Sequence, residues 1–170
     1  MSRYFTVKHM DRAARAIEQW RKERPDLDVS PMGVIGRLNE ASSLIARDRL
    51  APLFARFGLQ SGEFDVLATL RRSGAPYALT PTELYEATMV TSGAMTARLD
   101  RLEKAGLIQR APHPSDRRGV VVQLTAKGRE LIDEALTAHV ANEHQIITGL
   151  TREDREMLAR LLEKLIGSLS

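Results

Sequence analysis

Cysteine is absent from this 170-residue chain, and its absence excludes several kinds of chemistry. Without thiols there is no disulfide, no thiolate metal site and no peroxide sensing by cysteine oxidation. Aromatic residues are scarce, at 5% of the chain, and Trp20 is the one tryptophan. The N-terminal stretch has no long hydrophobic run, so we expect neither a signal peptide nor a membrane span, and by default a cytoplasmic protein.

Sequence signatures of catalysis are missing as well. The chain has no Gly-rich phosphate loop, no HExxH and no paired-carboxylate motif. The Ser-Gly pairs at residues 61–62 and 92–93 fit helix caps or close approach to a groove better than a nucleophile elbow. We therefore expect a protein that is not an enzyme and that needs no cofactor.

Two histidines on a predicted helix raise the question of a metal ion. His139 and Glu143 are one turn apart, and His144 follows directly. A lone helical pair of this kind usually belongs to a surface or an interface, and no cysteine or second close histidine pair supports a site. We predict no metal site, and whether these three residues bind any metal stays open.

Positive charge is concentrated in one part of the chain. The net charge is only +3, which permits nucleic-acid binding without requiring it. Residues 91–118 hold six Lys and Arg against three Asp and Glu, so this window alone carries as much net charge as the whole chain. A DNA contact is therefore expected here first.

Helix signals in and before this window follow a known order. Residues 80–83 (TPTE) have capping-box spacing with proline at the first helical position, which predicts a short helix to about Thr88. A second helix is predicted from an N-cap at Thr91 to a stop at Gly106. A hairpin should follow, with two arginines at its tip. Two short helices joined by a tight turn, then a hairpin, are the order of a winged helix-turn-helix.

The second helix has two different faces. Met95, Leu99 and Leu102 fall on one side of a helical wheel and should face a core. The opposite side is small and polar, which lets a helix backbone approach base edges in a major groove. An ordinary solvated face would look the same, but the paired arginines of the hairpin favour DNA. The residues predicted to contact DNA are Thr82, Ser92, Gly93, Thr96, Ala97, Arg101, Arg117 and Arg118.

Both ends of the chain carry more apolar helix surface than the middle could cover. We therefore predict a mainly α fold with a small β-wing and a dimer built from the N- and C-terminal helices, although these helices could instead pack within one chain. The predicted segments are N-terminal helices (1–57, including an extra first helix), a winged helix-turn-helix (58–124) and C-terminal dimerisation helices (125–170). A twofold pair would read two half-sites one helical turn apart in a pseudo-palindromic operator.

Residues 79–128 closely resemble the winged helix-turn-helix core of the multiple antibiotic resistance regulator (MarR) family. The match includes RLEKAGLI at the entry to the hairpin and DRRG at its tip. The resemblance implies a homodimeric DNA-binding transcriptional regulator, with repression as the expected mode.

One arginine of the second helix is misplaced for a DNA reader. Arg98 lies nearer the buried side of the wheel, where a guanidinium needs a partner, and Asp65 is a candidate. Together with Trp20 and Arg110 these residues resemble the ligand site of the urate-responsive branch of the family, as do residues 20–38 and 62–72 around them. That resemblance implies a planar purine anion, most simply urate, as the effector.

Three alternatives to a urate response stay open. Asp65 and Arg98 could form a network that locks the second helix to the scaffold, with Trp20 as ordinary core. The chain could be an architectural DNA-binding protein that has no ligand. It could also be a regulator that responds to a different aromatic acid.

Overall fold

The computed structural model describes residues 10–88, 92–116 and 119–169. The predicted N-cap Thr91 and the predicted DNA contacts Arg117 and Arg118 lie outside these residues. The chain divides into two compact units, residues 1–47 and residues 48–170. The three-segment division that the sequence favours stays a prediction.

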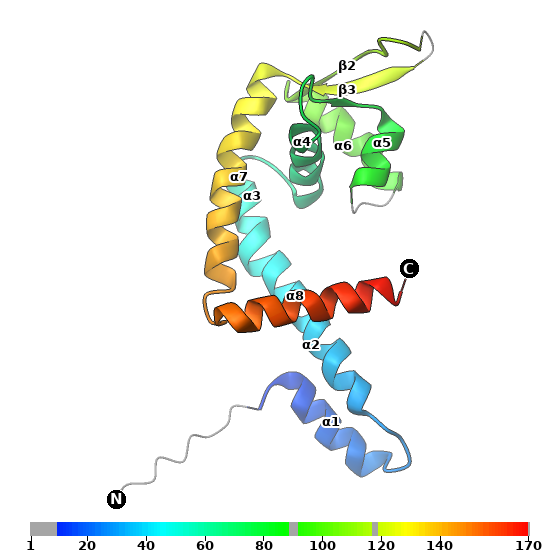
Figure 1. The fold of residues 1–170 in the computed structure, drawn as a ribbon, viewed down its shortest axis with the longest axis vertical. Helices are drawn as coiled ribbons and strands as arrows, with labels where there is room; N and C mark the ends of the chain where they lie inside the picture. Colours follow the sequence, from blue (N-terminus) through cyan, green and yellow to red (C-terminus); the bar gives the residue numbers. More distant parts are fainter. Residues whose placement is uncertain (1–9, 89–91, 117–118, 170) are drawn as a thin grey trace, which may run out of the picture. The chain divides into compact units, whose positions relative to one another are not determined.

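The first unit contains α1 (Arg12–Glu23) and α2 (Ser30–Leu44), which pack against each other (Figure 1). Asp11 caps α1 by accepting the Ala14 N–H at 2.8 Å, and it also binds Arg37 of α2 at 2.9 Å. The order Ser30-Pro31 favours Ser30 as the N-cap of α2, but the N-cap in the structure is Val29. Asp28 accepts the Ser30 N–H at 3.0 Å, so Ser30 becomes the first helical residue.

The apolar spacing between Ser30 and Phe57 favours one long helix, but a π-helical segment, η1 (Ile45–Leu50), follows α2 and interrupts it. Pro52 lies in the first turn of α3, directly after η1, and as a proline it has no N–H to donate there. The elements of the second unit are α3 (Ala51–Arg56), α4 (Ser61–Arg72), β1 (Ala78–Leu79), α5 (Pro81–Ala87), α6 (Ser92–Lys104), β2 (Ile108–Pro112), β3 (Val120–Leu124), α7 (Ala126–Ile146) and α8 (Arg152–Gly167).

Local capping signals set most of these helix ends. Thr80 and Glu83 cap α5 reciprocally, as predicted, and Thr151 and Asp154, which have the same spacing, do so for α8. Gly106 has φ of +70°, which confirms the predicted stop after α6. These predictions succeed because each depends on residues within one turn of the helix end.

The cap of α4 differs from the prediction. The sequence favoured Ser61, but Ser61 is the first residue of the helix and Gln60 is its N-cap. Glu63 accepts the Gln60 N–H at 2.8 Å, which satisfies a backbone donor at the helix start. Gln60 and not Ser61 is therefore the N-cap, because Glu63, three positions after Gln60, accepts the Gln60 N–H.

The wing is the hairpin that the sequence predicted, extended by a third strand. β3 lies between β2 and β1 in an antiparallel sheet, with Ile108 opposite Leu124 and Pro112 opposite Val120. The two-residue β1 pairs through Ala78 and Gln123. Such a short strand has no periodicity of its own, so only its pairing with β3 reveals it.

The core of the second unit gathers around α4, with α5, α6 and α7 packed about it (Figure 1). Val66, Leu67 and Leu70 of α4 are fully buried. On α6, the three predicted core residues Met95, Leu99 and Leu102 are buried, so the small and polar face points away from the core. Packing therefore fixes which side of α6 is free to meet a partner.

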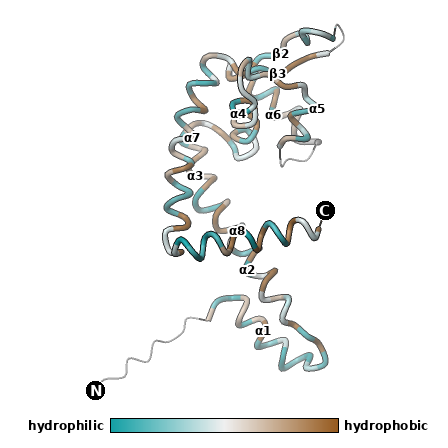
Figure 2. The backbone as a smooth tube through the Cα atoms, in the orientation of Figure 1, coloured by the Kyte–Doolittle hydropathy of each residue, from teal (hydrophilic) through white to brown (hydrophobic). Residues whose placement is uncertain are grey.

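The last helix is amphipathic but covers little. Hydrophobic and hydrophilic positions alternate along α8 (Figure 2), yet no α8 side chain within residues 152–167 is buried. Met157 and Leu161 are more than half exposed. Across the described ranges, no helix combines the length and apolar character that crossing a membrane requires.

Candidate nucleic-acid interface

The exposed face of α6 is the centre of the candidate interface. Thr96 and Ala97 are exposed on the side opposite the buried leucines, and the helix begins at Ser92 and Gly93. Thr82 is exposed in the first turn of α5, where unpaired backbone N–H groups attract anions. The helix pair and the wing thus lie next to each other in the order that the sequence predicted.

Arg101, predicted to contact DNA, is bound by the protein itself. Its Nε donates to Glu63 Oε1 at 2.6 Å, and its Nη2 contacts Gln60 Oε1 at 3.4 Å. The Glu63 side chain is 7% exposed and that of Arg101 is 47% exposed. The arginine therefore joins the outer edge of α6 to a buried carboxylate at the start of α4, and its DNA contact stays a prediction.

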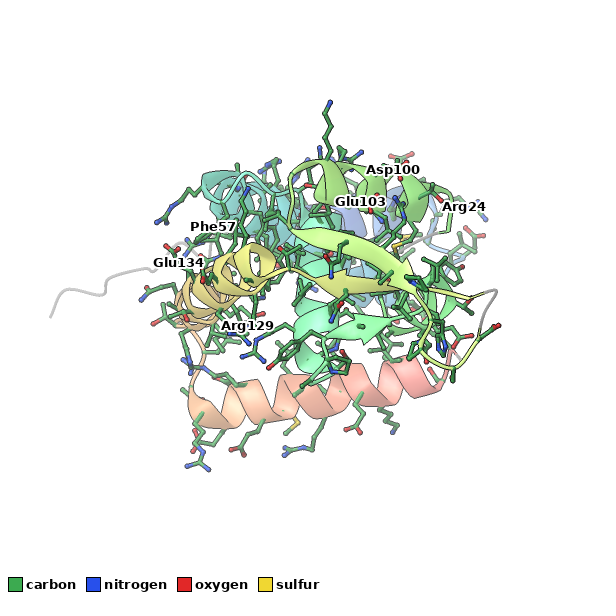
Figure 3. All side chains as sticks on the ribbon, turned by 90° about the horizontal axis from the view of Figure 1, so that it is seen from above. Arg24, Phe57, Asp100, Glu103, Arg129 and Glu134 are labelled. Carbon is green, nitrogen blue, oxygen red and sulfur yellow. The ribbon has the colours of Figure 1, made fainter. Side chains whose placement is uncertain are left out.

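Arg110 joins the wing to the recognition helix. Its guanidinium binds Asp100 Oδ1 at 2.6 Å and also pairs with Glu103, and its backbone N–H donates to Glu103 at 3.1 Å. Asp100 and Glu103 project from α6 beside the wing (Figure 3). The bond to Asp100, followed by the charge of Glu103, raises the pKa of Arg110. In this state the arginine ties β2 to α6.

Arg98 has a buried nitrogen that the protein does not satisfy. Its side chain is half-buried, and its Nη1 has no hydrogen-bond partner among the residues that the structure describes. The guanidinium lies against Gly62 of α4, one turn from Asp65. An unsatisfied buried N–H is costly, so an acceptor placed here would be favourable.

Asp65 lies near Arg98 without contacting it. Burial raises the pKa of Asp65, and Coulombic interaction, first with Arg98 and then with His139 and Arg72, acts in the opposite direction. In the described part of the chain, no hydrogen bond or ion pair joins Asp65 to Arg98. The direct ionic pair suggested by the sequence is therefore not formed, and both groups keep bonding capacity.

Of the three predicted ligand residues in the second unit, two are brought together. Asp65 and Arg98 are neighbours across α4 and α6. Arg110 is bound to Asp100 and Glu103, which point to the other side of α6 from Arg98. Trp20 belongs to α1 in the first unit and is 46% exposed.

The residues that bind or contact these arginines were not predicted from the sequence. They are Gln60, Gly62, Glu63, Asp100 and Glu103. The QSGE spacing at residues 60–63 was a visible capping signal, but nothing local connects it to an arginine 38 positions later. Such pairs are set by tertiary packing.

His139 belongs to an aromatic cluster. Its ring lies 4.7 Å from the Phe64 ring and 5.6 Å from the Phe54 ring, and its Nε2 is 3.1 Å from Glu143. Over the described ranges, no three His, Asp or Glu side chains are grouped as a metal site would require. Its Nδ1 is buried and has no hydrogen-bond partner among the residues that the structure describes.

Comparison with known proteins decides the family. A MarR family sequence model matches residues 57–119. The transcriptional regulator PecS of Dickeya dadantii is 46% identical over 162 residues, which cover 95% of this chain and 93% of PecS. The MarR protein of Salmonella typhimurium is 33% identical over 141 residues, covering 82% and 93% respectively. The chain belongs to the MarR family. It is a DNA-binding transcriptional regulator, and members of this family are not enzymes.

Solved structures agree with this assignment. A MarR family regulator of Streptomyces coelicolor in complex with DNA matches with a TM-score of 0.75 and 27% identity, covering 85% of this chain and 90% of that one. A mutant MarR of Escherichia coli complexed with operator DNA matches with a TM-score of 0.68 and 26% identity, covering 86% and 96%. The mainly helical fold with a small β-wing is therefore that of a MarR-type winged helix-turn-helix.

Proposed function

We propose that this MarR-family chain is a homodimeric repressor that releases a pseudo-palindromic operator when urate or a related purine anion binds beside Arg98. The observation that carries the effector is the buried, unpartnered Nη1 of Arg98 next to Asp65. DNA reading is assigned to α5, α6 and the wing. A transcriptional regulator must reach DNA in order to act, which supports a cytoplasmic location.

The DNA surface is proposed from exposure and chemistry. Thr96 and Ala97 lie on the free face of α6, and Thr82 lies at the start of α5. Ser92, Gly93 and Arg101 belong to the same helix, and Arg117 and Arg118 follow from the sequence alone. Base contacts from α6 would give sequence preference, and phosphate contacts from the wing would give affinity that falls with salt.

The dimer is supported by apolar side chains that no part of their own unit covers. A large exposed apolar surface is rare on a soluble monomer and marks an interface. These side chains lie mainly on α2 and α8 and include Met32, Val34, Ile35, Leu38, Leu44, Met157, Leu158, Leu161 and Ile166. Pairing two chains through them would place two reading heads on one duplex.

The effector is proposed from complementary bonding groups. An anionic oxygen or ring nitrogen would satisfy the Arg98 N–H, and Asp65 could accept a ring N–H of a purine. A stacking role for Trp20 follows from the sequence resemblance alone, and Arg110 is a second guanidinium if it leaves Asp100 and Glu103. Since Arg98 is on α6 and Asp65 is on α4, a ligand bound to both would favour a different placement of α6 and so lower DNA affinity.

Urate titrated into a preformed protein–operator complex tests the proposal, with DNA release followed by fluorescence anisotropy. Wild-type protein should release DNA, and the charge-preserving variant Arg98→Lys should respond less. Salicylate, tested in parallel, distinguishes a regulator of another aromatic acid. Release by neither compound at millimolar concentration would leave a DNA-binding protein without this effector.

A further inference from the structure

Glu63 uses its two carboxylate oxygens for two different elements. Oε2 accepts the Gln60 N–H at 2.8 Å and so caps α4, while Oε1 accepts Nε of Arg101 from α6 at 2.6 Å. The glutamate is 5% exposed. A carboxylate this deeply buried needs both bonds to offset the loss of water.

We propose that Glu63 is a positioning residue for DNA recognition, which holds the outer edge of α6 through Arg101. The inference rests on DNA reading by α6 and not on the effector. Because the other oxygen of the same carboxylate caps α4, a shift of α6 along α4 would break the Arg101 bond or disturb the helix start. Glu63 thus favours one placement of the recognition helix.

A second ion-pair group holds the same helix from the wing. Arg110 of β2 binds Asp100 and Glu103, which lie on another side of α6 from Arg101. The recognition helix is therefore attached on one side to the scaffold and on another to the wing. Glu63 provides the attachment of α6 to the scaffold.

The sign of the effect separates positioning from simple charge. Glu63 is negative, so by Coulomb repulsion alone its removal should strengthen binding to polyanionic DNA. If Glu63 acts by holding α6, its removal should weaken binding, because a loosely held helix loses more freedom when it binds.

The test is a double-mutant cycle measured as DNA affinity. The probe is a pseudo-palindromic duplex selected from a random pool by the wild-type protein, and failure to select any duplex would contradict the proposed function instead. Glu63→Gln keeps a neutral oxygen for the Gln60 N–H. We expect it to weaken DNA binding about fivefold, and to have little further effect in an Arg101→Ala background.

Two further variants separate the causes. Glu63→Asp keeps the negative charge but has a side chain one methylene shorter. If Glu63 acts by positioning α6, this variant should bind DNA more weakly; if it acts only by its charge, DNA affinity should not change. Asp154→Asn is the matched control, since Asp154 caps α8 in the same way but has no place in the reading head. Thermal unfolding of each variant confirms that binding is measured on folded protein.

Weaker binding by Glu63→Gln and Glu63→Asp that disappears without Arg101 supports the inference. Tighter or unchanged binding by Glu63→Gln overturns it. An equal loss with and without Arg101 also overturns it, because Glu63 would then act only as the cap of α4.

Discussion

The guanidinium of Arg98 lies directly against the backbone of Gly62. A β-carbon built at Gly62 would come within 2.5 Å of Arg98 Cζ and 2.8 Å of its Nη2. Gly62 is helical and does not need the left-handed conformation that often explains a glycine. The absence of a side chain therefore makes room for Arg98, and this arginine keeps its place beside Asp65 only while position 62 stays small.

Gly62→Ala should remove the effector response and leave the fold intact. The new methyl group would displace a flexible arginine and not backbone, and alanine favours the helix by up to about 1 kcal/mol. We expect the urate concentration for half-release of DNA to rise at least about tenfold. DNA affinity without urate should stay within about twofold of wild type.

Gly167→Ala at the end of α8 is the matched control, because a β-carbon there meets no atom within 4 Å. It should respond to urate like wild type. If the wild-type protein and Gly62→Ala respond equally to urate, the effector response does not depend on the contact between Arg98 and Gly62. If neither responds, the effector proposal itself is at fault.

Asp65→Asn should stabilise the protein near neutral pH. Burial raises the pKa of Asp65 despite the positive charge of Arg98, so the native state holds the Asp65 proton more tightly than the unfolded chain does. The ionised carboxylate therefore lowers stability above its raised pKa, and this cost disappears as pH falls below the ordinary value of 3.8.

Urea unfolding of wild type and Asp65→Asn at about pH 7 and about pH 3.5 measures this difference. The free energy of unfolding should be higher for the variant near neutrality and equal for the two proteins in acid. A less stable variant near neutrality would mean that Asp65 has a favourable partner in the native state.

Much of the fold follows from short-range signals. The caps at Thr80 and Thr151, the stop at Gly106 and the hairpin each depend on neighbouring residues. β1 was missed because two residues carry no alternation. The π-helical segment η1 was missed because its apolar spacing is compatible with an ordinary helix.

Less of the candidate site than of the fold could be predicted from the sequence. The helical wheel placed Arg98 toward the buried side, and the structure confirms its burial. Arg101 was predicted only as a DNA contact, because nothing in the sequence near it points to Glu63, which lies on another helix. For Arg110, the carboxylates at positions 100 and 103 become partners only when the wing folds back on α6.

Arg110→Gln should weaken DNA binding even without effector. The change leaves Asp100 and Glu103 without their cation on the recognition helix, and both would then repel phosphates. We expect a loss of about threefold to tenfold for all DNA sequences, measured by anisotropy at fixed salt. Adding Asp100→Asn and Glu103→Gln should restore much of the affinity. A role for Arg110 in ligand binding alone predicts unchanged affinity in the absence of urate.

Thr96→Ala and Arg118→Ala should have different effects on DNA binding. Thr96 is exposed on the free face of α6, so its loss should alter sequence preference, at a cost of about 1 to 3 kcal/mol at one base pair. Arg118 is predicted to meet phosphates, so its loss should weaken all duplexes alike and reduce the salt slope by about one. Selection of DNA pools by each variant, with salt titrations, measures both. An unchanged preference for Thr96→Ala would remove it from the base-reading surface.

In the proposed dimer, two copies of this chain present two reading heads to one duplex at a fixed separation. Inserting about five base pairs between the half-sites of the selected operator turns one half-site to the opposite side of the DNA. We expect two chains per operator by sedimentation and a fall to non-specific affinity after the insertion. One chain per duplex, or an affinity that ignores the insertion, would contradict the proposed dimer.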